Sequence, residues 1–255
     1  MAGFTLASFN KMVKHILRPF LIIYGLSLFA VGLVITYCIV RIISLRDTLA
    51  ANKAIFSILK GWSQVTVRLL NGRPLDVTGN PAEGRYIVVA NHVCYGDAVN
   101  LFSARPDYFH ALGKKELVKV PLFGFLYKQV VILVDRNSPE SRAESMRKMM
   151  RFLKEEGNIF IFPEGTFNET QQPLKEFYDG AFRLAITAQT PILPLVFLDA
   201  NDRLHYKKWW TWWPGKNRAI YLDPVNVSGL TLEDVPKLKL QIYTLMENAI
   251  IKYRV

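Results

Sequence analysis

The sequence predicts an α/β fold, in which helices flank a mixed, mostly parallel sheet and a hydrophobic helical membrane anchor precedes it. Three observations support this prediction. From about residue 73, short apolar runs of strand length alternate with helical patterns. These runs are apolar at nearly every position, as expected for strands that are buried on both faces. Residues 19–40 form an uncharged, apolar stretch that is long enough to cross a bilayer.

The composition restricts the class of protein further. Of the 255 residues, 32 are Lys or Arg and 21 are Asp or Glu, so the net charge is +11, and 51% are hydrophobic. An apolar content this high excludes intrinsic disorder. A basic protein fits nucleic acid, an anionic membrane or a phosphorylated ligand, and a mean hydropathy of +0.14 favours the membrane. Composition alone admits both partners; because the anchor and the motifs described below account for the apolar residues and the cations, we expect membrane lipids as partners and no nucleic acid.

The apolar stretch at 19–40 has one Arg on each side. It is longer than the apolar core of a secretory signal, which has about 7–15 residues, so we expect it to be retained. A second helix, over about residues 50–70, repeats apolar residues at helical spacing. It lies either in the membrane interface or against a protein core. We assign residues 1–70 to an N-terminal membrane anchor and residues 71–255 to one globular domain.

Strands and helices alternate in the globular domain. One helix is predicted after Ser138, a typical N-cap, with Pro139 in its first turn and Gly157 at its end. Two more helices are predicted over residues 174–188 and 235–253. The predicted strands cover residues 86–90, 130–134, 158–162, 192–197 and 219–222.

The end of the first predicted strand carries the first candidate site. Residues 86–90 run directly into Asn91 and His92, and Asp97 follows His92 by five positions. Ligands of open α/β sheets bind at the carboxyl ends of the strands. A carboxylate that accepts a hydrogen bond from one imidazole nitrogen leaves the other nitrogen free to act as a base. The alternative is a structural histidine beside a turn.

A second strand end has a matching character. Residues 158–162 are followed by Pro163-Glu164-Gly165-Thr166, which supply a proline that stops the strand, an acid and a glycine. This composition fits a loop that brings backbone N–H groups close to a ligand, although a simple tight turn is the alternative. Between the two strand ends, Lys115 and Arg136 supply cations. No Cys/His spacing predicts a metal site.

The ordered set of these motifs resembles the glycerolipid acyltransferase family, typified by lysophosphatidate (1-acylglycerol-3-phosphate) acyltransferases. Each motif alone is modest, but the set in this order behind an apolar segment is specific. The motifs are Asn-His-x4-Asp at 91–97, Pro-x-Phe-Gly at 121–124, Asp-Arg at 135–136, Phe-Pro-Glu-Gly-Thr at 162–166, and a strand beside prolines at 191–195.

The resemblance implies a role for each matching residue. His92 would be the general base that removes the proton from a lipid hydroxyl, and Asp97 would orient His92 and stabilise its charge. Arg136 and Lys115 would hold the phosphate of the acceptor lipid. The motif Glu164-Gly165-Thr166 would shape the acceptor pocket.

The activity implied by the resemblance is that of a membrane-bound O-acyltransferase in phospholipid synthesis. It would move a fatty acyl group from acyl-CoA or acyl carrier protein to the sn-2 hydroxyl of lysophosphatidate, without a bound cofactor or metal. Residues 71–255 would form the acyltransferase domain. The expected location is the cytoplasmic (inner) membrane, with this domain facing the cytoplasm.

One residue departs from the pattern of the family. The family commonly continues Glu-Gly-Thr with Arg, whereas this chain has Phe167. A cation is therefore missing where the acceptor phosphate would be bound, although Lys114, Lys175 and Arg183 lie nearby in the sequence. A lyso-aminolipid or another lysophospholipid is the alternative acceptor. The non-enzyme alternative is a membrane-anchored protein that only binds anionic lipid.

Two further features leave alternatives open. Cys94 lies inside the first motif, so a covalent acyl-enzyme competes with direct transfer, while a small packing residue is the simpler interpretation. Residues 207–213 hold four of the five tryptophans beside lysines. We predict that this segment either docks the domain on the bilayer or packs as a cluster under a loop.

Overall fold

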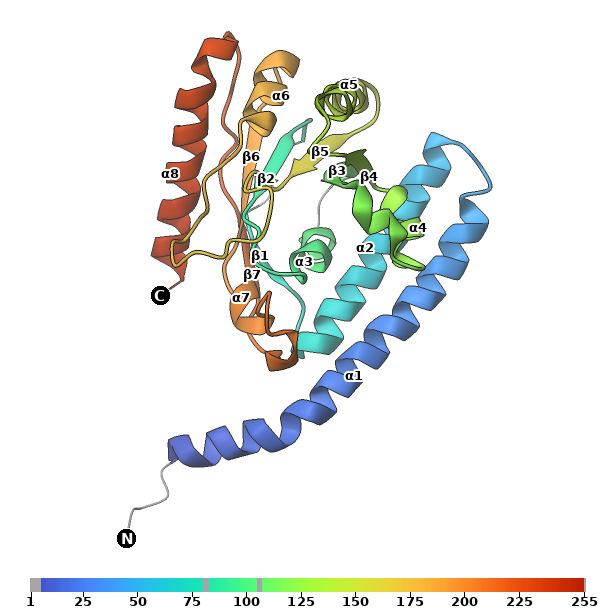
Figure 1. Cartoon of the computed structure of the whole chain (residues 1–255), viewed down its shortest axis with the longest axis vertical. Coiled ribbons are helices and arrows are strands. Elements are labelled where there is room, and N and C mark those ends of the chain that lie inside the picture. Colours follow the sequence, from blue (N-terminus) through green and yellow to red (C-terminus); the bar gives the residue numbers. More distant parts are fainter. Residues whose placement is uncertain (1–5, 80–82, 105–106, 255) are drawn as a thin grey trace.

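The computed structural model describes residues 6–79, 83–104 and 107–254. These residues form a seven-stranded sheet in the spatial order β1-β7-β6-β2-β5-β3-β4 (Figure 1). All neighbouring strands are parallel except β6 and β7, so the predicted mixed, mostly parallel sheet is confirmed. The strands are β1 (Asp76–Thr78), β2 (Ile87–Ala90), β3 (Phe109–Lys114), β4 (Val131–Val134), β5 (Asn158–Ile161), β6 (Ile192–Phe197) and β7 (Arg218–Tyr221).

Helices cover both faces of the sheet. The α-helices are α1 (Leu6–Ile43), α2 (Leu49–Asn71), α3 (Asp97–Ser103), α4 (Phe123–Lys128), α5 (Pro139–Glu155), α6 (Gly180–Ala188), α7 (Ala200–Arg203) and α8 (Val235–Tyr253). Short 3-10 helices are η1 (Lys115–Lys119), η2 (Trp209–Thr211) and η3 (Leu232–Asp234). One core forms between the sheet and α5, α6 and α8, and a second forms between the sheet and α2, α3 and α4. Along β2, Ile87 and Val89 join the first core, whereas Val88 joins the second.

The five predicted strands agree with β2, β4, β5, β6 and β7 to within one residue at either end. Their continuous apolar runs are explained by burial on both faces. Sequence reasoning missed β1 and β3. β1 has only three residues and lies at the sheet edge, and β3 is mostly half-buried and includes His110 and Gly113, so neither shows the apolar run of a central strand.

Two predicted helices are found where expected. α8 coincides with the predicted range. α5 begins directly after Ser138, whose side chain caps it by accepting a hydrogen bond of 3.1 Å from the backbone N–H of Ser141. Its last helical residue is Glu155, two residues before Gly157.

The helix predicted over 174–188 begins later, at Gly180. The backbone N–H of Lys175 donates to the Glu164 carboxylate at 2.8 Å, and the N–H of Tyr178 donates to the Pro163 carbonyl at 2.9 Å. These groups bond to the 163–164 loop, so they are not available for a helix. The early start was therefore wrong, because a tertiary interaction replaces the local helical pattern.

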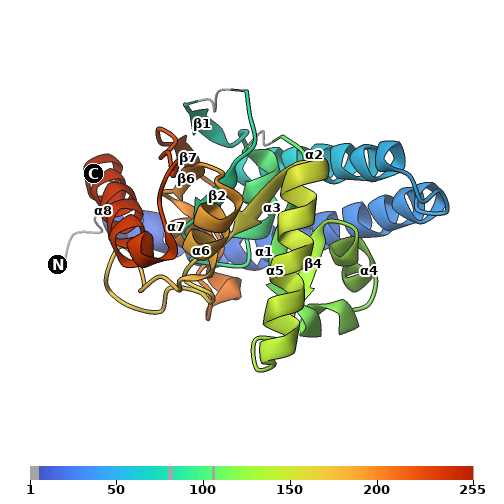
Figure 2. The same cartoon turned by 90° about the horizontal axis from the view of Figure 1, so that it is seen from above.

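α1 extends the predicted apolar helix toward the N-terminus. It bends in its N-terminal third (Figure 1), where Pro19 lies inside the helix; a proline lacks the N–H and clashes with the preceding turn. Among the described residues, one helix is long and apolar enough to cross a membrane, over Met12–Ile43; its most apolar 18-residue stretch has a mean hydropathy of 2.3, and 11% of that stretch is buried. Figures 1 and 2 show α1 lying alongside α2.

The amphipathic helix predicted at about 50–70 is α2. It begins after Thr48, whose hydroxyl accepts a hydrogen bond from the backbone N–H of Ala51. Its apolar face, which includes Ile55, Phe56 and Leu59, belongs to the core that covers the sheet. This face of α2 therefore packs against the protein core, which is one of the two alternatives predicted from the sequence. α2 also connects α1 to the globular domain.

Candidate active site

Two loops meet at the carboxyl edge of the sheet. β2 and β5 are parallel neighbours, with Val89 opposite Ile161, so the loops that follow them leave the sheet at the same edge. The backbone N–H of His92 donates to Glu164 Oε1 at 2.8 Å, and the N–H of Asn168 donates to the His92 carbonyl at 2.7 Å. The structure thus brings together the two strand ends that the sequence singled out.

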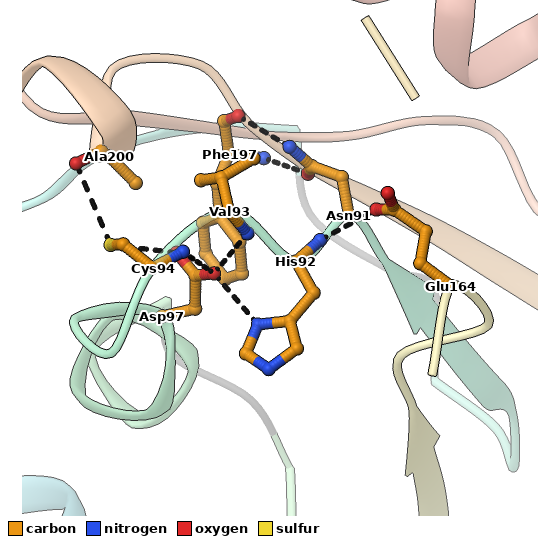
Figure 3. Close-up of polar contacts among 8 residues, drawn as sticks. All are labelled: Asn91, His92, Val93, Cys94, Asp97, Glu164, Phe197 and Ala200. Atoms are coloured by element: carbon orange, nitrogen blue, oxygen red, sulfur yellow. Dashed lines mark hydrogen bonds and ion pairs between the residues drawn. The ribbon is translucent and has the colours of Figure 1, made fainter. Parts of the chain in front are cut away.

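His92 and Asp97 form a hydrogen-bonded pair (Figure 3). Asp97, the first residue of α3, is fully buried, and its Oδ2 accepts from His92 Nδ1 at 2.9 Å and from the backbone N–H groups of Val93 and Cys94 at 2.6 and 2.9 Å. Because a carboxylate only accepts, Nδ1 carries the proton and Nε2 has a free lone pair. Nε2 points away from Asp97 (Figure 3), and the His92 side chain is 20% exposed. This geometry suits a general base.

Two aromatic rings enclose the imidazole. Phe162 stacks on His92 with ring centroids 3.9 Å apart and an interplanar angle of 14°. Phe167 meets the imidazole edge-on at 4.5 Å and also contacts Tyr95 at 4.7 Å. The stacking partner and the Asp97 hydrogen bond together fix the orientation of the ring. Sequence reasoning missed this role, because it took Phe162 as the last residue of a strand.

Glu164, which was expected to shape the acceptor pocket, is buried between two loops. Its side chain is fully buried; Oε1 accepts from the backbone N–H of His92 and Oε2 accepts from that of Lys175, both at 2.8 Å. Burial raises the pKa of Glu164 from its ordinary value of 4.5 to about 7, against the opposing effect of these two hydrogen bonds. Glu164 therefore joins two loops and acts on the site through the backbone of His92.

Gly165 forms the turn beside Arg136. Its φ of 72° is left-handed, and a Cβ at this position would lie 2.8 Å from the ring of Tyr178. Both facts require glycine. The Arg136 guanidinium donates to the Gly165 carbonyl, so this predicted phosphate ligand lies directly against the predicted acceptor loop.

The other predicted phosphate ligand is already paired. The Lys115 ammonium contacts the Asp135 carboxylate, and both side chains are partly exposed. The pair raises the pKa of Lys115 and lowers that of Asp135 through their mutual hydrogen bond. An acid in direct contact offsets the charge that Lys115 offers to an anion. Thr166 is exposed, and its hydroxyl accepts a hydrogen bond of 2.9 Å from Lys175 Nζ.

Asn91 has a structural function that the sequence did not indicate. Its side chain donates to the Phe197 carbonyl at 2.9 Å and accepts from the Phe197 N–H at 2.8 Å (Figure 3). This pair of hydrogen bonds joins the end of β2 to the end of β6 just before His92. The signal available in the sequence was a buried-strand run that ends in an amide, but its partner lies 106 residues away.

Cys94 lies behind Asp97 and is buried. Its thiol is 3.5 Å from Asp97 Oδ1 and 3.6 Å from the Ala200 carbonyl. Burial raises the pKa of the Cys94 thiol, and the Asp97 charge raises it further. A protonated, enclosed thiol is a poor nucleophile, so the geometry favours direct acyl transfer.

Replacing Cys94 by Ser is expected to leave the rate of acyl transfer within about threefold of wild type, because the serine hydroxyl keeps a donor where the weak S–H donor faces Asp97. Steady-state rates of purified protein test this. A thiol-reactive probe on wild type provides the control, since a buried thiol should react slowly in the folded protein. Loss of all turnover in a folded Cys94→Ser protein would instead support an acyl-enzyme.

The tryptophan segment packs against the N-terminal helix. The ring of Trp212 lies beside Gly25 of α1, within ordinary van der Waals distance of where a Cβ would stand, and the Lys14 ammonium lies 5.5 Å from the ring of Trp213. Trp210 is half exposed; the side chain of Trp209 lies outside the described residues. Packing therefore accounts for two of the tryptophans.

Taken together, the fold and the site define the class of protein. A hydrogen-bonded His–Asp pair lies at the carboxyl edge of a mostly parallel sheet, with a basic nitrogen exposed and cations on the adjacent turn. This arrangement suits an α/β enzyme in which an imidazole acts as a general base with cations nearby.

Comparison with known proteins narrows this class. The family model described as Acyltransferase matches residues 74–198. A 1-acyl-sn-glycerol-3-phosphate acyltransferase of Haemophilus influenzae is 33% identical over 168 residues, which cover 65% of this chain and 68% of that protein. The alpha form of the same enzyme from Mus musculus is 31% identical, over 67% of this chain and 61% of that protein. The chain belongs to the acyltransferase family, and the resemblance seen in the sequence is confirmed.

A solved structure has a similar fold. The 1-acyl-sn-glycerophosphate acyltransferase PlsC of Thermotoga maritima aligns with a TM-score of 0.79, over 95% of this chain and 98% of that chain, at 21% identity. The similarity extends over the N-terminal helices as well as the sheet, because nearly the whole of each chain is covered.

Proposed function

We propose that this acyltransferase moves a fatty acyl group from an acyl thioester to the sn-2 hydroxyl of lysophosphatidate, and so forms phosphatidate. The His92–Asp97 pair carries the proposal, because it presents a basic nitrogen toward solvent. The names of the relatives in Haemophilus influenzae and Mus musculus support the acceptor. Because these relatives are named as acyltransferases, they also support catalysis rather than lipid binding alone.

The proposed step is a direct transfer. His92 Nε2 takes the proton of the acceptor hydroxyl while its oxygen attacks the carbonyl carbon of the thioester. Asp97 holds the imidazole and stabilises its positive charge. The tetrahedral intermediate then breaks its C–S bond, and the departing sulfur receives the proton from His92. Acyl-CoA or acyl carrier protein serves as co-substrate, and the step requires no bound cofactor.

We place the reaction at the cytoplasmic (inner) membrane, with the acyltransferase domain facing the cytoplasm. α1 supports the membrane part of this proposal, because large apolar side chains such as Phe20 and Ile42 are about 70% exposed and their burial in lipid is favourable. A lysophospholipid reaches the site from the membrane, whereas the thioester donors arrive from the water phase.

Turnover by the purified protein tests this function. Lysophosphatidate and a lyso-aminolipid are each offered with acyl-CoA and with acyl carrier protein thioester, and the diacyl product is identified by mass spectrometry. Phosphatidate as the preferred product supports the proposal. Turnover of the lyso-aminolipid without turnover of lysophosphatidate would contradict it.

Phe167 favours a second candidate acceptor. Its ring contacts His92 and Tyr95, so an aromatic surface stands beside the base at the position where the family commonly has Arg. An acceptor with less negative charge, such as a lyso-aminolipid, fits such a surface better than a phosphate monoester.

Replacing Phe167 by Arg is expected to raise kcat/KM for lysophosphatidate relative to a lyso-aminolipid by roughly 10- to 100-fold, since a charge-assisted contact to phosphate contributes about 1.5–3 kcal/mol. Phe167→Leu serves as the control, because it removes the ring without adding charge. An equal change for both acceptors in the Arg variant would show that position 167 does not distinguish them.

A further inference from the structure

The candidate site has fewer available cations than the family pattern supplies. Phe167 stands in place of the family Arg, and Lys115 is neutralised by Asp135. Arg136 remains, with its guanidinium on the Gly165 carbonyl. A phosphate monoester carries nearly two negative charges at neutral pH, so a second cation is expected near the same turn.

The structure places Lys175 beside the turn that Gly165 and Thr166 form. One carboxylate, that of Glu164, accepts the backbone N–H of His92 on Oε1 and the backbone N–H of Lys175 on Oε2, each at 2.8 Å. The backbones of the base and of Lys175 are therefore separated by a single buried side chain. In the sequence the two residues are 83 positions apart, and only tertiary structure makes them neighbours.

The Lys175 side chain continues along the same loop. Its Nζ donates to Thr166 Oγ1 at 2.9 Å, and Thr166 is exposed. A hydroxyl is a neutral partner, so this contact leaves the ammonium charge in place and two of its three N–H donors unused by Thr166. Arg136 contacts the preceding residue, Gly165, through a carbonyl that is equally neutral. Two cations thus flank the turn formed by residues 165 and 166.

We propose that Lys175 binds the phosphate of the acceptor, together with Arg136, and supplies the cation that Phe167 does not. Lys175 is then a specificity-determining residue for a phosphorylated acceptor. This inference rests on the proposed function, because it assigns a ligand to the acceptor phosphate. It also explains how a chain with an aromatic residue at position 167 can still prefer lysophosphatidate.

Kinetics of the full-length Lys175→Ala variant test the proposal. The KM for lysophosphatidate should rise roughly 10- to 100-fold, while kcat stays close to that of wild type, because a charge-assisted bond to the non-reacting end of the acceptor is lost. Lys175→Arg should restore most of the affinity. Lys148→Ala, which removes an exposed lysine paired with Glu144 on α5, is the control and should change neither constant.

A binding measurement separates this inference from the proposed function. Calorimetry with glycerol 3-phosphate reports on the anion site without acyl transfer. Binding to wild type and loss of binding in Lys175→Ala support the site even if lysophosphatidate is not the substrate. Equal binding by both proteins, an unchanged KM in Lys175→Ala, or an equal fall in kcat for both the Ala and Arg variants would overturn the proposal.

Discussion

Replacing His92 by Ala is expected to lower kcat for acyl transfer by roughly 10²- to 10⁴-fold, the usual contribution of a positioned general base. The acceptor hydroxyl is not acidic enough to attack a thioester unaided, and Nε2 is the basic atom that the Asp97 hydrogen bond leaves exposed. Steady-state release of free thiol from the donor measures the rate, and circular dichroism confirms that the fold is intact.

Two further variants control this experiment. Asp97→Asn should also slow transfer strongly, because an amide that donates to the imidazole stabilises the wrong tautomer. His15→Ala removes an exposed histidine of α1 and should leave the rate unchanged. If a folded His92→Ala protein keeps more than about a tenth of the wild-type kcat, His92 is not the general base.

Replacing Glu164 by Gln is expected to lower both stability and kcat. The amide nitrogen cannot accept, so one of the two backbone N–H groups that now bond to the carboxylate, from His92 and Lys175, loses its partner. An unsatisfied buried donor costs about 1–3 kcal/mol of unfolding free energy. The backbone of His92 also loses its anchor, and a small displacement of a base can slow a reaction about 10-fold or more.

The difference in stability between wild type and Glu164→Gln should change with pH in a definite direction. The pKa of Glu164 is raised from 4.5 to about 7 in the folded protein, so the native state binds more protons than the unfolded state between these values. The contribution of Glu164 to the free energy of unfolding of wild type is fully present below pH 4.5. It is lost as the pH rises through 7, by up to about 3 kcal/mol. Because the Gln side chain does not titrate, the stability of wild type relative to Glu164→Gln should fall as the pH rises from 4.5 through 7.

Thermal unfolding of both proteins in detergent at several pH values between 4.5 and 8 measures this difference. Glu144→Gln is the matched control, because Glu144 is exposed on α5 and pairs only with Lys148 in the described ion pairs. Its deficit should be small at every pH. A Glu164→Gln deficit that stays constant or grows with pH would contradict the raised pKa.

Much of the fold could be predicted from local patterns. The central strands were found because burial on both faces demands an apolar residue at every position, and α5 was found because Ser138 and Pro139 form a strong start signal. The edge strand β1 and the half-buried β3 carry weaker patterns. The start of α6 could not be predicted, because the N–H groups of Lys175 and Tyr178 bond to Glu164 and Pro163, which belong to an earlier loop of the chain.

The candidate site was predictable in its residues but less so in their arrangement. His92 and Asp97 are five positions apart, so local geometry brings them together. By contrast, the burial of Glu164 could not be predicted, because its carboxylate accepts the backbone N–H of Lys175 from a second loop. Lys115 was expected to be available to phosphate, and only the structure reveals its acidic partner.

By itself, the sequence determined the fold class, the apolar N-terminal helix and the spacing of the candidate His–Asp pair. These properties depend on short-range periodicity and on spacing within one loop, which the chain carries locally. The tertiary structure alone decided which cations face the Gly165 turn, which rings enclose His92, and that Glu164 joins the backbones of His92 and Lys175. Such contacts join residues far apart in the chain, so they exist only once the parallel strands bring their carboxyl ends to one edge of the sheet.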